Sequence, residues 1–79
     1  MARQYQFKVE DETYHWSEQF ITGGEVRQQG PGIPEGMDLY LKVRNLPGRL
    51  VANDEKIDLA EPGIEKFYAQ DASSEAGNS

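Results

Sequence analysis

Apolar side chains recur at every second position in several segments of this chain, and this alternation constrains its fold more than any other feature. Tyr5, Phe7 and Val9 alternate with polar residues, and the pattern resumes at Tyr14 and Trp16 after a short polar turn. A period of two places the apolar side chains on one face of a β-strand. Two such runs around a short turn predict a β-hairpin with one buried face.

The same alternation continues in the second half of the chain. Leu39, Leu41 and Val43 share one face of a predicted strand, while Tyr40 and Lys42 project from the other face. Residues typical of turns then separate the remaining strand candidates, which cover residues 49–51, 57–59 and 64–68.

A helix start lies between these two groups of strands. Thr22 and Glu25 have the spacing of a capping box, in which each side chain accepts a hydrogen bond from the other residue's backbone amide. Ile21 and Val26 fit the hydrophobic staple that accompanies such a box. The helix is predicted to begin directly after Thr22 and to end before residues 30–32, a Gly-Pro-Gly sequence. A helix this short needs packing against the sheet to form.

The predicted order is strand, strand, helix, strand, short strand, strand. This order is that of a β-grasp, an α+β fold of ββαββ type with one short helix packed across a mixed sheet. The first and last strands would then lie side by side in the centre of the sheet. We expect this domain to cover residues 1–68. Residues 69–79 contain no large apolar side chain and are expected to form a flexible C-terminal tail.

Length and composition argue against several classes of function. A chain of 79 residues with 37% apolar residues supports one thin core and not a deep substrate pocket, which counts against an enzyme. The 14 acidic and 8 basic residues give a net charge of −6, which disfavours nucleic acids and anionic membranes and favours a basic protein partner.

The absence of cysteine removes thiol catalysis, disulfides and zinc–thiolate sites. It also indicates a reducing compartment, and no apolar run is long enough for a signal peptide or a membrane span, so we expect a cytoplasmic protein. His15 is the one histidine and is expected on the surface, so no metal or cofactor is expected. Trp16, on the opposite strand face, is expected in the core.

Four segments carry a resemblance to a known family. They are Tyr5–Val9, Ile21–Gly23, Leu39–Leu41 and Ile57–Tyr68, of which the last is the longest and most specific. In these segments the chain resembles the bacterial ubiquitin-like domains of multiubiquitin type, which are associated with E1-, E2- and JAB-peptidase-like genes. Gly32-Ile33-Pro34 is also similar to the loop that follows the helix in ubiquitin.

The resemblance implies a β-grasp protein modifier that is not itself an enzyme. Its implied partners are an E1-like adenylating enzyme, an E2-like carrier, a JAB-like metallopeptidase and target proteins, in gene clusters that suggest antiphage defence. The exposed sheet surface that such modifiers present to partners would include Tyr40 and Lys42. Processing and conjugation would involve the end of the fold, at Tyr68, Ala69, Gln70, Asp71 and Ala72.

One departure from the family pattern leaves alternatives open. The di-glycine end that ubiquitin uses is missing, because Gly77 is followed by Asn78 and Ser79. The tail is then cut upstream, or a different terminus is used, or the protein is not conjugated. The alternatives to a modifier are a non-covalent interaction module and, with less support, a sulfur carrier.

Overall fold

The computed structural model describes residues 4–71, which form a five-stranded mixed sheet, a two-stranded sheet and one helix. The large sheet has the order β2-β1-β7-β4-β5, and β3 pairs with β6 in the small one. The elements are β1 (Tyr5–Val9), β2 (Glu12–Trp16), β3 (Phe20–Thr22), α1 (Gly23–Gln29), β4 (Met37–Val43), β5 (Arg49–Leu50), β6 (Lys56–Asp58) and β7 (Ile64–Asp71).

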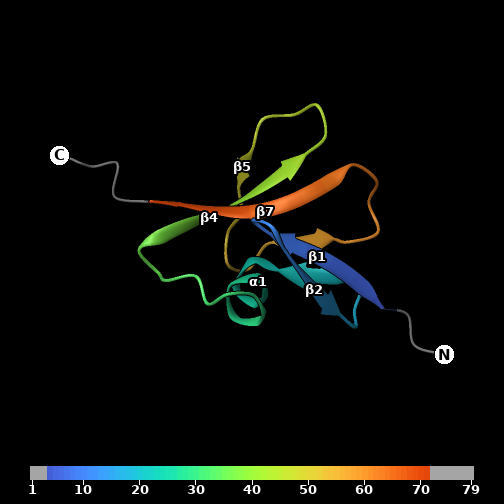
Figure 1. Ribbon diagram of the computed structural model, residues 1–79, viewed down its shortest axis with the longest axis horizontal. Helices are drawn as coiled ribbons and strands as arrows, with labels where there is room; N and C mark the ends of the chain where they lie inside the picture. The colour runs from blue at the N-terminus through green and yellow to red at the C-terminus, as the bar shows by residue number, and fades with distance from the viewer. Residues whose placement is uncertain (1–3, 72–79) are drawn as a thin grey trace.

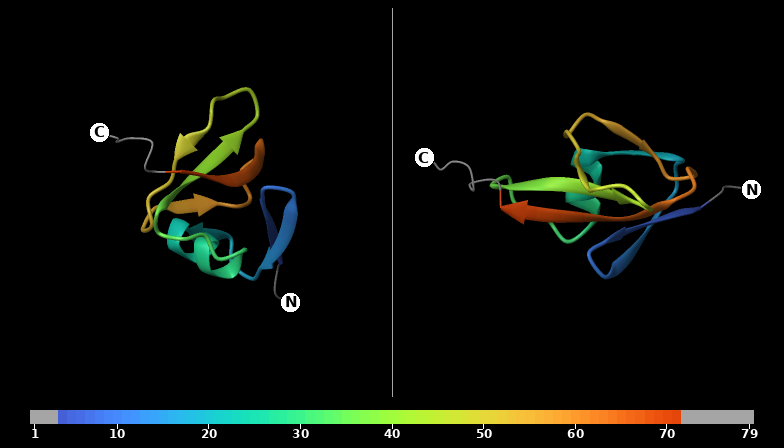
Figure 2. Two further views of the ribbon diagram at one scale, coloured as in Figure 1. Left: turned by 60° about the vertical axis from the view of Figure 1, so that its left-hand side comes forward. Right: turned by 90° about the horizontal axis from the view of Figure 1, so that it is seen from above.

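The two strands at the ends of the described chain lie together in the large sheet, as the sequence predicted. β1 and β2 form the expected antiparallel hairpin, with Phe7 opposite Tyr14. β1 is parallel to β7, with Val9 beside Phe67. β4 is antiparallel to β7 over almost its whole length, and Figure 2 shows the two strands running side by side.

The helix begins where the capping box predicted. The Thr22 Oγ1 atom accepts from the Glu25 amide at 3.2 Å, and the Glu25 Oε1 atom accepts from the Thr22 amide at 2.9 Å. The amides of Gly23 and Gly24 donate to carbonyls in the segment that leads to β6, so donors that the first helical turn cannot satisfy find partners there. Gly23 is required because a Cβ at that position would overlap the backbone of Ala52.

One core fills the space between the large sheet and the helix. Figure 1 shows α1, β3 and β6 on one side of β4 and β7. The hydrophobic staple residues belong to this core, whose buried side chains are Phe7, Val9, Ile21, Val26, Leu39, Leu41, Val51, Ile57 and Phe67. Strand order and helix position together confirm the predicted ubiquitin-like β-grasp.

Four strands, β3, β5, β6 and β7, differ from the prediction. β3 was not expected, because it has three residues and its first, Phe20, is 48% exposed, so it carries no alternating signal. β5 ends at Leu50, one residue early, and β6 is shifted to begin one residue earlier than predicted, at Lys56. β7 continues to Asp71, three residues beyond the predicted end.

That last difference moves the boundary between fold and tail. Residues 69–71 pair with the first three residues of β4, so their backbone groups are satisfied although they bring no large apolar side chain. The expected flexible tail therefore does not begin at Ala69. The remainder of that segment, residues 72–79, lies outside the described residues.

Trp16 and His15 lie close to where the sequence placed them. His15 is exposed, as predicted. Trp16 is only half-buried and packs against the edge of the core, and its indole Nε1 donates to the Phe20 carbonyl at 2.9 Å. In the described part of the chain, no helix is long and apolar enough to cross a membrane.

Candidate partner-binding face

Within residues 4–71, no helix or strand covers the face of the large sheet opposite α1. The alternation of β4 decides which side chains this face presents. Leu39 and Leu41 are buried against the core, at 0% and 3% exposure. Tyr40 and Lys42, predicted to point the other way, do so and are partly exposed. We call this uncovered surface of β1, β7, β4 and β5 the open face.

A row of apolar and aromatic side chains crosses the open face. Tyr40 lies opposite Tyr68 on β7 and opposite Leu50 on β5. The two tyrosine rings stack, with centroids 5.3 Å apart and planes at 14°. Leu50 is 55% exposed. We call Leu50, Tyr40 and Tyr68 the tyrosine row.

A glycine holds the tyrosine row against the β4–β5 connection. A Cβ at Gly48 would overlap the Tyr68 hydroxyl and ring. Only a residue without a side chain lets this connection approach the ring so closely. The position of the Tyr68 ring is therefore fixed from one side by Tyr40 and from the other by the backbone at Gly48.

A row of three lysines crosses the same face beside the tyrosines. Lys42 lies opposite Lys66 on β7. The parallel pairing of Val9 with Phe67 places Lys8, one position earlier on β1, beside Lys66. We call Lys8, Lys66 and Lys42 the lysine row.

Two of these ammonium groups have defined positions. The Lys66 Nζ atom lies 6.0 Å from the centroid of the Tyr68 ring, within reach of a weak cation–π interaction. The Lys42 Nζ atom donates to the Val43 carbonyl at 2.9 Å and to the Leu46 carbonyl at 2.7 Å. These partners are carbonyl oxygens, and no carboxylate of residues 4–71 forms an ion pair with Lys42.

The residues predicted for processing lie on the strand that carries this face. Tyr68, Ala69, Gln70 and Asp71 all belong to β7, and Ala72 lies outside the described residues. Tyr68 thus belongs both to the predicted processing region and to the tyrosine row that the structure reveals.

The residue directly after β1 secures β7 near its end. Glu10 follows β1 with a φ of 55°, and its amide donates to the Phe67 carbonyl at 2.9 Å. Its Oε2 atom accepts from the Ala69 amide at 3.2 Å. Because β1 ends at Val9, this carboxylate takes over where strand pairing on that edge of β7 stops.

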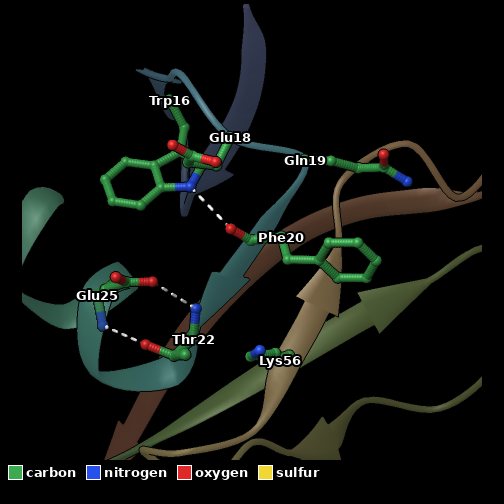
Figure 3. Close-up of a pocket in the computed structure, with 7 residues that line it drawn as sticks. All are labelled: Trp16, Glu18, Gln19, Phe20, Thr22, Glu25 and Lys56. Carbon is green, nitrogen blue, oxygen red and sulfur yellow. Dashed lines mark hydrogen bonds between the residues drawn. The ribbon is translucent and has the colours of Figure 1, made fainter.

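A shallow hollow of about 410 Å³ lies away from the open face, beside β3 and the start of α1. Figure 3 shows that its polar groups are largely engaged: Thr22 and Glu25 cap the helix, and Trp16 bonds to the Phe20 carbonyl. Its lining consists of Trp16, Glu18, Gln19, Phe20, Thr22, Glu25 and Lys56. These groups stabilise local structure and do not form a constellation of nucleophile and base.

Electrostatic interactions within residues 4–71 are few. Arg49 and Glu55 form the one ion pair of the described residues, at 2.6 Å, on the surface. The hydrogen bond from Arg49 holds the pKa of the Glu55 carboxyl below its ordinary value. Among the same residues, no group of three His, Cys, Asp or Glu side chains is placed to hold a metal ion.

Sequence reasoning found two members of the open face and missed the rest. Alternation within the first predicted strand already placed Lys8 on the other face from Phe7, whereas the last predicted strand was given no face assignment. The signal that these side chains share one surface with Tyr40 was absent, because it depends on strand order and register.

This sheet order, the single helix across it and the uncovered opposite face define a ubiquitin-like β-grasp protein. The sequence model of the multiubiquitin family matches residues 5–71, so the chain belongs to that family. Comparison with curated proteins and with solved structures finds no match.

Proposed function

We propose that this chain is a ubiquitin-like modifier whose C-terminal carboxylate is activated by an E1-like adenylating enzyme. The observation that carries the proposal is membership of the multiubiquitin family over residues 5–71, together with a fold that places the last described strand in the sheet centre. In this arrangement β7, the strand that precedes the C-terminal segment, has a neighbouring strand on each side.

In the proposed reaction, the carboxylate attacks the α-phosphorus of ATP, which forms an acyl-adenylate and releases pyrophosphate. A thiol of the enzyme then displaces AMP, and the acyl group passes through an E2-like carrier to a nucleophile of a target protein. The chain supplies the carbonyl and a docking surface, and the partners supply the catalytic groups. Its dependence on ATP places the pathway in the cytoplasm, with antiphage defence as its proposed setting.

The extent of β7 restricts where the chain is trimmed. A peptidase needs an unpaired, extended segment, and Tyr68 to Asp71 are paired with β4. We therefore place the cut made by a JAB-like peptidase after Asp71, within residues 72–79, and no longer at the bonds between Tyr68 and Asp71.

The test is a series of chains that end at each position from Asp71 to Ser79, incubated with ATP and an E1-like enzyme of the same genome. Intact mass measured without reductant should show an ATP-dependent adduct for one end or a few neighbouring ends. A series in which no end gives an adduct, with the enzyme shown to form adenylate on another substrate, would overturn the proposal.

The open face supports a second candidate, a non-covalent interaction module. Tyr40 and Tyr68, which are partly exposed, and Leu50, which is exposed, form a row of aromatic and apolar side chains of the kind found in protein interfaces. Under this alternative, partner binding is unchanged when the chain is ended at Asp71, and no adduct forms. A sulfur carrier is the third possibility, and thiocarboxylate at the terminus after incubation with ATP and a sulfur donor would identify it.

A further inference from the structure

The lysine row is unusual in a chain of this charge. The protein has a net charge of −6, yet Lys8, Lys66 and Lys42 lie side by side on three neighbouring strands. None of the three forms an ion pair with any residue from 4 to 71. Positive charge is thus collected on one face of an otherwise acidic molecule.

This arrangement opposes folding. Like charges directly opposite one another destabilise a pair of strands, and Lys66 has a lysine on each side. A surface selected for solubility alone would alternate the signs across the strands. The lysine row is better explained by an anionic group that lies over it in a complex.

The neighbouring tyrosine row indicates that the ligand carries an apolar side chain in addition to its anionic group. The stacked rings of Tyr40 and Tyr68 and the exposed Leu50 lie one step along the strands from the lysines. Tyrosine rings and a leucine side chain together form a surface on which an apolar or aromatic side chain of a ligand can pack. A ligand that covers both rows carries carboxylates on one side and an apolar side chain on the other.

The acidic groups nearest the rows orient this ligand. Asp38 lies beyond Tyr40 on β4, and Glu61 and Glu65 line a hollow of about 210 Å³ together with Lys8. Carboxylates therefore lie near the Lys8 end of the lysine row, whereas Lys42 bonds to carbonyl oxygens. This difference favours a ligand whose own carboxylates lie at the other end, over Lys66 and Lys42. A long polyanion such as a nucleic acid would meet the negative potential of the rest of the molecule, whereas a short peptide segment would not.

We propose that the open face binds an acidic peptide segment of a partner protein, with carboxylates over Lys66 and Lys42 and an aromatic or branched apolar side chain on the tyrosine row. The inference rests on the proposed function, because it names the chemistry by which the partner enzymes recognise this modifier. It reverses the expectation from net charge, which favoured a basic partner.

The test is an NMR titration of the isotope-labelled full chain with a short synthetic peptide in which glutamates flank a tyrosine and a leucine. We expect shift changes at the lysine and tyrosine rows, weakening with added salt, and no binding of the matched peptide in which glutamine replaces each glutamate. Lys66→Glu should weaken binding by about tenfold or more. Lys56→Glu makes the same charge change beside the hollow near β3 and should leave binding unchanged.

Three results would each overturn the inference. They are shift changes centred on the hollow beside β3, binding of the glutamine peptide as tight as that of the glutamate peptide, and an equal loss of peptide affinity in Lys66→Glu and Lys56→Glu. Tighter binding of oligothymidylate than of the acidic peptide at the open face would also overturn it. The titration requires neither ATP nor a trimmed terminus. Adduct formation without peptide binding would therefore contradict only this inference. Peptide binding without adduct formation would contradict only the modifier role.

Discussion

At the scale of single residues, two glycines show that close backbone approach, more than turn geometry, explains why a side chain is missing. Gly23 lies against the backbone of Ala52, and Gly48 lies against the Tyr68 ring. Gly36, by contrast, has open space where a Cβ would be. The sequence gives no sign that the three glycines differ; only the fold shows which of them have no room for a side chain.

Gly23→Ala is expected to lower the free energy of unfolding by about 1–3 kcal/mol, as overpacking does in a core. Helix propensity alone predicts the opposite sign, because alanine favours a helix over glycine by up to about 1 kcal/mol. Urea denaturation measures the change. Gly36→Ala is the control and should be neutral or slightly stabilising; equal effects of the two variants would contradict the packing argument.

The pKa of Glu55 tests the surface ion pair. Because the hydrogen bond from Arg49 lowers this pKa in the folded state, the pair adds stability above the carboxyl's ordinary pKa. That stability is lost as the pH falls through the folded value. Arg49→Gln should raise the pKa of Glu55 toward its ordinary value, measured by NMR pH titration. An unchanged pKa would mean that the pair does not persist in solution. Any stability effect should be small, since the pair lies on the surface with both side chains partly exposed.

At the scale of elements, strand pairing explains features that composition does not. β7 holds its last three residues in the sheet through backbone pairing with β4 and through the Glu10 carboxylate. The same strand aligns Lys66 between two other lysines. Both features follow from register, and each leads to a measurable difference between closely related variants.

A chain ended at Tyr68 should be less stable than one ended at Asp71, by about 1–3 kcal/mol, because it loses the hydrogen bonds between residues 69–71 and β4. A chain ended at Asp71 should have the thermal midpoint of the full chain, since it keeps every pair of β7 with β4. Thermal unfolding by circular dichroism compares the three. Equal midpoints for all three chains would mean that the pairing of residues 69–71 with β4 adds no stability.

Lys66→Glu should raise the free energy of unfolding by about 0.2–1 kcal/mol, because it replaces two like-charge neighbours with two opposite-charge pairs. The same substitution is expected to weaken acidic-peptide binding, so stability and binding change in opposite directions. Lys56→Glu, which has no lysine opposite it on β3, lacks this relief and should not be stabilising. Denaturation at low salt, where the effect is largest, decides the sign.

At the scale of the whole molecule, one small core unites almost all the elements. A chain of this length has a stability of roughly 4–12 kcal/mol, and complete truncation of a buried aromatic removes about 3–5 kcal/mol. Phe67, at 0% exposure and on the central strand, is the side chain whose loss the fold tolerates least.

Phe67→Leu should leave the protein folded but destabilise it by about 1–2 kcal/mol, through the volume that leucine leaves empty. Phe20→Leu makes the same chemical change at a side chain that is 48% exposed and should have little effect. Chemical denaturation of both variants gives the comparison. A similar loss at the two positions would show that β3 is packed more tightly than its exposure indicates.

The sequence was most informative where structure is local. The capping box at Thr22 and Glu25 and the alternation of β1, β2 and β4 are encoded within a few residues, and each was predicted correctly. β3 is too short to show a period, and the last residues of β7 are held by a partner strand rather than by their own side chains. The same limit applied to the candidate site. Tyr40 and Lys42 could be assigned to one strand face from the sequence, but their neighbours on other strands could not, because these depend on strand register.

The parallel alignment of β1 and β7 has a mechanical consequence. β1 leads in from one end of the described chain and β7 leads out at the other, and the two run in the same direction beside each other. Tension applied between the two ends pulls these strands past one another along a common axis. The contacts that join them include the pairing of Val9 with Phe67 and the hydrogen bond from the Glu10 amide to the Phe67 carbonyl. Under such tension these contacts bear the load together instead of parting one by one. Pulling on both ends of the domain therefore loads the pairing of β1 with β7 in shear.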